Sequence, residues 1–311
     1  MKMNRAAAFI LFSMFSAGFL SLARPSIVPQ EKPRIRILTT VIPLQEFVRE
    51  TAGERGDVGL LLPPGAEVHT WQPKVSDIRK FASWDVFIYI GHGLEPWASD
   101  ILKGAARPGL KVFEIGRELP LLSPGPEGDH RDASASLDPH IWLDFGLDLV
   151  IIDRLQDLLQ TLEPENAGLF ERNAARYKER LRRLDDKCRL AFGSCLQKTF
   201  IFGGHEAFGY FARRYGLEQV AVYGLSPDAA PTPKELAAIM AEAKTRKIKT
   251  IFFEPGVSDK MARLIAREIG ADIRLLNPGH NLTKEQIAAG VTFIDLMESN
   301  LESFKHGLAC R

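Results

Sequence analysis

Three of the seven histidines lie where their imidazoles could bind a metal ion. His69 lies in the Pro- and Gly-containing segment PPGAEVHTWQP, His140 lies in LDPHIWLD, and His205 lies in TFIFGGHEAFGYF. Neutral imidazole suits Zn²⁺ and related transition metals, and three imidazoles with one further group form a common tetrahedral set. A single loop histidine is more often an ordinary solvated residue, so the hypothesis depends on the elements that position these three.

Two series of short apolar segments predict parallel β-sheets next to these histidines. Segments rich in β-branched or aromatic residues cover 34–40, 57–63, 85–91 and 110–116 in the first series, and 199–204, 218–224, 250–255 and 272–278 in the second. Segments with a helical pattern separate the strands, and this alternation indicates βαβ units. We therefore predict two α/β lobes, each with a roughly four-stranded parallel sheet. Ligands of open parallel sheets bind beyond the carboxyl ends of the strands, where the three histidines would lie.

The region between the two series is predicted to be helical. Apolar residues recur with helical spacing from 147 to 162, and the pattern ends at Pro164. Leu169, Tyr177, Leu181 and Leu184 then form an apolar stripe in a second segment, which predicts one helix of about 20–27 residues. The predicted organisation is an N-terminal lobe over 24–146, a helical linker over 147–196 and a C-terminal lobe over 197–311, with the long helix as a rigid connection.

The N-terminus has the pattern of a secretory signal. Lys2 and Arg5 precede an uncharged segment over 6–23 that ends in the small-residue sequence Ser-Leu-Ala. This pattern predicts a signal peptide over residues 1–23 that is cleaved on export. The alternative is an uncleaved membrane anchor, because the apolar segment just reaches spanning length.

Export gives the three cysteines a structural interpretation. Cys188, Cys195 and Cys310 are too few and too widely spaced for a cysteine-based zinc site. In an oxidising compartment they predict one disulfide and one remaining thiol. The pairs Cys195–Cys310 and Cys188–Cys195 are both possible, and the sequence does not choose between them.

The ordered motifs of the chain resemble one family. PPGAEVHTWQPKVSDIRK, IGHGLEPW, LDPHIWLD, GGHEAFGYFARRYGL and SPDAAPTPKEL are similar to segments of the periplasmic zinc- and manganese-binding proteins of metal ABC transporters. The resemblance covers nearly the whole mature chain. It implies two α/β lobes joined by one long helix, a metal ion in the cleft between them, and delivery of that ion to a transmembrane permease. It also implies a periplasmic protein without catalytic activity, which we expect to be a monomer.

The resemblance implies a ligand set as well. His69 matches the loop histidine of the first lobe, His140 matches the histidine of the family's Asp-Pro-His motif, and His205 matches the ligand that opens the first helix of the second lobe. Manganese-binding members often have a carboxylate at this third position, so His205 favours Zn²⁺. A receptor for Mn²⁺ or for a metal chelate remains the alternative.

The fourth ligand is open at this point. The family often places an Asp near the end of the last strand, where this chain has Asn277. Glu254 closes the seventh predicted strand and is our first choice, and Glu206, His280 or a water molecule could also fill the position. His92 in IGHGLEPW could hydrogen-bond to a ligating imidazole, since such rings need a partner for their second nitrogen.

The sequence gives weaker support to other classes of function. The formal net charge of +1 gives no electrostatic footprint for nucleic acid. The segment HEAFG lacks the second histidine of a zinc-protease motif, because Gly209 stands at that position. A zinc hydrolase with Glu206 as general base, or an adhesive surface protein with a structural metal, would be chemically possible on the same scaffold.

Overall fold

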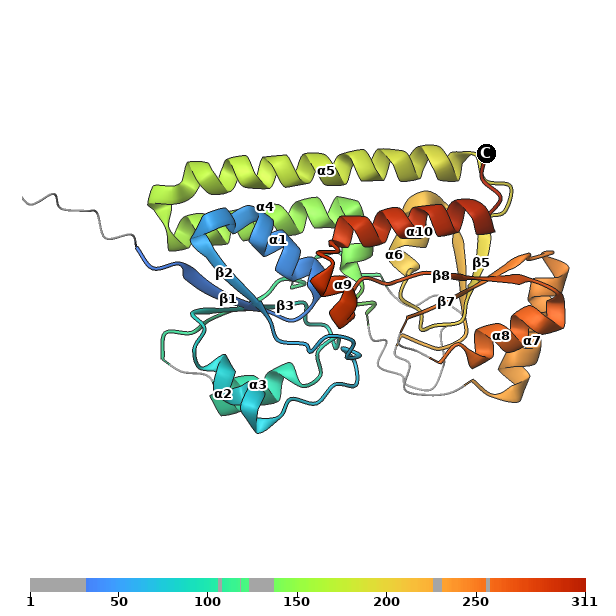
Figure 1. The fold of residues 1–311 in the computed structure, drawn as a ribbon, viewed down its shortest axis with the longest axis horizontal. Coiled ribbons are helices and arrows are strands. Elements are labelled where there is room, and N and C mark those ends of the chain that lie inside the picture. The colour runs from blue at the N-terminus through green and yellow to red at the C-terminus, as the bar shows by residue number, and fades with distance from the viewer. Residues whose placement is uncertain (1–31, 106–107, 118, 123–136, 226–230, 256–257) are drawn as a thin grey trace, which may run out of the picture. The chain divides into compact units, whose positions relative to one another are not determined.

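The computed structural model describes residues 32–105, 108–117, 119–122, 137–225, 231–255 and 258–311 (Figure 1). Residues Arg34–Arg311 form one compact unit that contains two four-stranded sheets. The predicted signal peptide lies outside the described residues. Within those residues, no helix combines the length and apolar character needed to cross a membrane.

The first sheet has the strand order β2-β1-β3-β4, and all three pairings are parallel. Its strands are β1 (Ile35–Thr39), β2 (Gly56–Leu60), β3 (Val86–Tyr89) and β4 (Lys111–Glu114). The helices of this half are α1 (Ile42–Ala52), α2 (Val75–Phe81) and α3 (Ala98–Ala105). Figure 1 shows α2 and α3 on the face of the sheet opposite to α1.

The second sheet repeats this topology, with the parallel order β6-β5-β7-β8. Its strands are β5 (Thr199–Phe202), β6 (Glu218–Ala221), β7 (Thr250–Phe253) and β8 (Asp272–Leu275). The helices are α6 (Gly209–Tyr215), α7 (Pro233–Thr245), α8 (Lys260–Ile269), α9 (Lys284–Ala288) and α10 (Phe293–Gly307). The predicted fold class, with two parallel four-stranded sheets flanked by helices, is confirmed.

Two consecutive helices connect the sheets. Helix α4 (Phe145–Leu162) ends just before Pro164, and α5 (Ala167–Gly193) is the predicted long helix, with 27 residues. Asp144 caps α4, because its Oδ1 accepts the backbone N–H of Gly146 at 2.7 Å. The buried stripe of α5 includes Tyr177, Leu181 and Leu184, as the spacing predicts. Helix α5 lies along α4 and α10 in Figure 1.

The apolar core is continuous across the two halves. Phe200 and Phe202 of β5 belong to the large cluster that also contains the core of the first sheet and of α5, whereas Ile201 belongs to a smaller cluster with α7 and α8. Alternate side chains of a strand point to opposite faces, so the inner face of the second sheet shares its core with the connecting helices. The long helix is therefore packed along its length and does not stand free between the halves.

Two further connections cross between the halves. Glu46 of α1 accepts a hydrogen bond from the Tyr177 hydroxyl of α5 at 2.6 Å and from the backbone N–H of Phe293, at the start of α10, at 2.5 Å. After β8, the chain returns to the first half, where the Asn281 side chain donates to the carbonyls of Pro63 and Ala66 at 2.7 and 2.8 Å. The segment 277–282 is therefore held against the loop that carries His69.

Cys195 and Cys310 form a disulfide, which confirms one of the two predicted pairings. It joins the residues that follow α5 to the C-terminal residues that follow α10. Cys188 is the remaining thiol; it is buried on α5, and burial is the main cause that raises its pKa to about 12. A thiol with so high a pKa is protonated and has a structural role.

Candidate metal centre

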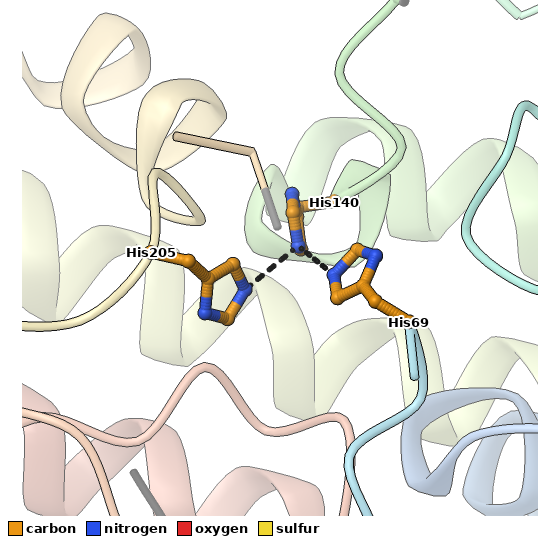
Figure 2. Close-up of side chains that lie close together, drawn as sticks. All are labelled: His69, His140 and His205. Carbon is orange, nitrogen blue, oxygen red and sulfur yellow. Dashed lines mark hydrogen bonds between the residues drawn. The ribbon is translucent and has the colours of Figure 1, made fainter. Parts of the chain in front are cut away.

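The imidazoles of His69, His140 and His205 converge, although 136 positions separate the first from the last. The Nε2 atom of His140 lies 3.3 Å from Nε2 of His69 and 3.1 Å from Nε2 of His205 (Figure 2). One ring nitrogen from each of the three lies within 4.8 Å of the others. His140 and His205 are completely buried, and His69 is half-buried.

The geometry fits a tetrahedral zinc ion. Nitrogens that bind Zn²⁺ at about 2.0–2.1 Å in a tetrahedral arrangement lie roughly 3.3 Å apart. The two Nε2 separations of 3.3 and 3.1 Å are close to this value. The third pair, His69 and His205, offers ring nitrogens within 4.8 Å of each other, so all three rings can face one ion.

His140 is positioned by the residues just before α4. The Asp138 carboxylate accepts the backbone N–H of His140 at 2.9 Å and its ring Nδ1–H at 2.7 Å. The Tyr210 hydroxyl of α6 donates to the Asp138 carbonyl at 2.9 Å. Because the carboxylate holds Nδ1, the Nε2 atom carries the lone pair that faces the other rings.

His205 follows β5 and has an equivalent carboxylate. Its Nδ1 lies 2.8 Å from the Oε2 atom of Glu254, which follows β7, the neighbouring strand of the same sheet. A Cβ at position 204 would lie only 2.5 Å from that oxygen, so Gly204 permits the carboxylate to approach the ring. Helix α6 begins only at Gly209, so His205 lies in a turn before the helix, whereas the sequence placed it at the helix entrance.

The electrostatics keep two of the three rings neutral. Burial, together with the neighbouring imidazoles, lowers the pKa of His69 to about 2 and that of His140 well below its ordinary value. Burial also acts to lower the pKa of His205, but the carboxylates of Glu254, Glu67 and Asp138 together outweigh it, and the pKa is raised. Neutral imidazole is the form that binds a metal ion.

A second group of possible ligands lies beside the first. Glu67, Glu254 and His280 each present a ligand atom within 4.8 Å of the others. The Nε2 atom of His280 lies 3.4 Å from Oε2 of Glu67, and the ring of His280 is 6.1 Å from that of His205, measured between centroids. His280 is only 7% exposed, and its Nδ1 atom has no hydrogen-bond partner among the described residues.

Comparison with known proteins identifies the family of the chain. The family model described as "ZnuA: Zinc-uptake complex component A periplasmic" matches residues 37–307. The chain belongs to this family. Zinc-binding protein AdcA of Streptococcus pyogenes serotype M18 is 32% identical over 310 residues, which cover 95% of this chain but 59% of that protein. High-affinity zinc uptake system protein ZnuA of Bacillus subtilis is 34% identical over 282 residues, which cover 88% of both.

Solved structures of family members have the same architecture. The Zn(II)-bound ZnuA-like domain of Streptococcus pneumoniae AdcA has a TM-score of 0.74 and 34% identity, and the match covers 88% of this chain and 99% of that one. The laminin binding protein Lmb of Streptococcus agalactiae is described as a bifunctional protein with adhesin and metal transporting activity. It has a TM-score of 0.77, 29% identity and the same coverage.

The other residues that the sequence suggested as ligands, or as partners of ligands, do not contribute to the cluster of three Nε2 atoms. Glu254 is at the Nδ1 side of His205, away from the nitrogen that faces His140. The Asn277 side chain accepts the N–H of Gly279 at 2.8 Å. Glu206 is half-buried, and burial is the main cause that raises its pKa. The Nε2 atom of His92 lies 3.1 Å from the backbone carbonyl of Gly116, so this nitrogen of His92 pairs with backbone and not with a ligating imidazole.

Two carboxylates near the site, Asp138 and Glu67, were not identified from the sequence. For Asp138 a signal existed, because it stands two residues before His140 in the segment LDPH. Glu67 likewise stands two residues before His69, and its Oε1 accepts the backbone N–H of His69 at 3.2 Å. Burial acts to raise the pKa of Glu67, but His280, His205 and His69 together lower it well below its ordinary value.

Proposed function

We propose that this protein is a high-affinity extracytoplasmic receptor for Zn²⁺ that delivers the ion to the permease of an ABC transporter. The observation that carries the proposal is the convergence of three buried or half-buried imidazoles with Nε2 separations of 3.1 and 3.3 Å. Membership of a family described as a periplasmic zinc-uptake component supports it. The protein would act as a monomer in the periplasm after loss of its signal peptide.

His69, His140 and His205 supply three ligands through Nε2, and His280 supplies the fourth through Nδ1. The argument for His280 is the pattern that it shares with two of the others. His140 and His205 each place one nitrogen against a carboxylate and leave the other free for the metal. His280 does the same in reverse, with Nε2 next to Glu67 and with a buried Nδ1 that has no hydrogen-bond partner in the described part of the chain. To bind the ion, His280 would have to turn Nδ1 toward the other rings, and its ring lies 6.1 Å from that of His205, measured between centroids.

In this proposal, carboxylates contact the ligating rings and do not bind the metal themselves. Asp138, Glu254 and Glu67 each contact one ligating ring, and their negative charge offsets that of a dication bound by neutral nitrogens. In this arrangement Glu254 orients His205 and does not bind the metal itself. Asn277 stabilises the turn before His280, through the bond that its side chain accepts from Gly279.

This ligand set selects zinc and disfavours catalysis. Imidazole nitrogen suits Zn²⁺, whereas Mn²⁺ prefers carboxylate, carbonyl and water oxygens. Four protein ligands around a tetrahedral ion leave no position for the activated water that a zinc hydrolase needs. The site therefore binds and releases its ion without chemical change.

Binding joins the two halves of the molecule. His69 and His280 lie on segments that are hydrogen-bonded to each other, while His205 follows strand β5 of the second sheet. An ion that contacts all of them favours the arrangement in which both halves are close, and this arrangement would be the one that docks on the permease. We expect the change to be small, because the core is continuous through the connecting helices.

Elemental analysis tests the proposal. The mature protein prepared from the periplasm is expected to hold about one zinc per chain, and to retain it against a competing chelator. The variant His205→Ala should lose that zinc, whereas His306→Ala, which removes an exposed histidine of α10, should retain it. A wild-type protein without metal that takes up no zinc from the chelator would contradict the proposal.

A further inference from the structure

His69 is the one proposed ligand that is half-buried and not fully buried, and it lies on a loop. The residues between the end of β2 at Leu60 and the start of α2 at Val75 form neither helix nor strand. A ligand on such a loop is ordered only by the contacts of its backbone and side chain. If it were mobile, the cost of ordering it would lower the affinity of the site for the ion.

Resting on the function proposed above, we propose that the indole of Trp97 is a positioning residue for His69. Its Nε1–H donates to the carbonyl of Val68 at 3.0 Å. Val68 and His69 share one peptide group, and the N–H of that group donates to Oε1 of Glu67 at 3.2 Å. Both ends of the peptide group that precedes the ligand are therefore held, one by Trp97 and the other by Glu67.

The bond to Trp97 is shielded from water. Val68 is completely buried and Trp97 is only 2% exposed. A buried carbonyl that loses its donor has no solvent to replace it, so the loop would have to move to satisfy the group. Movement of this peptide would displace His69 directly.

Trp97 is itself fixed by the preceding turn. The Glu95 carboxylate is buried and accepts the N–H groups of Ile90 and Gly91 at 3.0 and 2.9 Å and the hydroxyl of Thr40 at 2.5 Å. These bonds hold a turn in which three consecutive residues, Gly91 to Gly93, have positive φ. The turn thus links the end of β3 to Trp97, and Trp97 links it to the ligand loop.

Trp71 completes the arrangement on the other side of His69. Its ring packs edge-on against Trp97, with centroids 4.8 Å apart. The backbone N–H of Trp71 also donates to the carbonyl of Glu67 at 2.9 Å, which closes the turn that contains His69. The motif IGHGLEPW, which contributes no ligand, is in this way assigned a role in the site.

A double-mutant cycle separates positioning from general destabilisation. Trp97→Phe keeps an aromatic ring but removes the N–H donor, and it should weaken zinc binding by about 10–100-fold, mainly through faster release. In a His69→Ala background the same substitution should cause no further loss, because the residue through which it acts is absent. Trp84→Phe in the same half is the matched control and should leave zinc affinity unchanged.

Each result has a distinct meaning. Unchanged zinc affinity in Trp97→Phe, or an equal loss with and without His69, would overturn the role of Trp97. Unchanged affinity in His69→Ala would instead overturn the proposed ligand set. If Trp97→Phe does not fold, 3-benzothienylalanine at position 97 gives the same comparison, because it replaces the N–H by sulfur in a ring of similar shape.

Discussion

Glu254 Oε2 lies 2.8 Å from His205 Nδ1, and neither side chain is exposed to solvent. The two residues follow adjacent strands of the second sheet, β5 and β7, so the register of those strands fixes their separation. A carboxylate on Nδ1 holds the tautomer that presents the Nε2 lone pair to the metal, and it makes that nitrogen a stronger donor. The position of Glu254 therefore predicts that it influences zinc binding without being a ligand itself.

Glu254→Gln is expected to weaken zinc binding by about 10–100-fold without abolishing it. The amide keeps the size of the side chain but loses the negative charge that supports the imidazole. Competition against a chromogenic chelator measures the change. Glu268→Gln, on an exposed position of α8, is the matched control. Complete loss of zinc in Glu254→Gln, as in His205→Ala, would indicate that Glu254 is itself a ligand.

His280→Glu is expected to change the selectivity of the site. A carboxylate oxygen in place of the fourth nitrogen should improve Mn²⁺ binding relative to Zn²⁺ by roughly an order of magnitude. The ratio of the two dissociation constants, measured by competition, reports the change directly, and His306→Glu controls for added surface charge. If the ratio stays constant in His280→Glu while Asn277→Ala releases zinc, the fourth ligand is Asn277 and not His280.

Much of this architecture could be predicted because the residue types and apolar spacing of each segment indicate its secondary structure. Short β-branched and aromatic segments predicted the eight strands that the described residues form, and the apolar stripe from Tyr177 to Leu184 predicted the long helix. The three histidines were found because the carboxyl ends of parallel strands meet at one edge of a sheet. These inferences needed only residue types and their spacing.

Contacts between distant segments could not be predicted in the same way. The bond from Trp97 to Val68 and those from Asn281 to Pro63 and Ala66 join residues that are 29 and more than 200 positions apart. No periodic pattern encodes such pairs, because they arise only once the two sheets and their loops are packed. The same reason left the partner of each imidazole undetermined, although the residue types were visible.

Asp148 gives a prediction about stability instead of binding. It is completely buried on α4, and neither carboxylate oxygen has a hydrogen-bond partner among the described residues. Burial, with a contribution from Asp144 and against the opposing charge of Arg214, raises its pKa well above the ordinary value of 3.8. The folded protein therefore retains a proton at pH values where the unfolded chain has lost it.

The sign of the effect follows from proton linkage. Between the ordinary pKa and the raised one, unfolding releases a proton, so this residue makes the folded state less stable as the pH rises. Asp148→Asn cannot ionise and should escape this loss. Its melting temperature relative to the wild type should thus be higher at pH 8 than at pH 4, when both proteins are measured free of metal by calorimetry. Each unit of pKa difference corresponds to about 1.4 kcal/mol.

Asp157→Asn, on the exposed side of the same helix, controls for the loss of a charge from α4. Its melting temperature relative to the wild type should not depend on pH in this way, because its side chain is exposed and lacks the burial that affects Asp148. A constant difference between Asp148→Asn and the wild type across the same range would show that Asp148 ionises normally in the folded protein. In that case a polar group or water must reach the carboxylate in solution, since an unpartnered charge at this depth would be too costly to maintain.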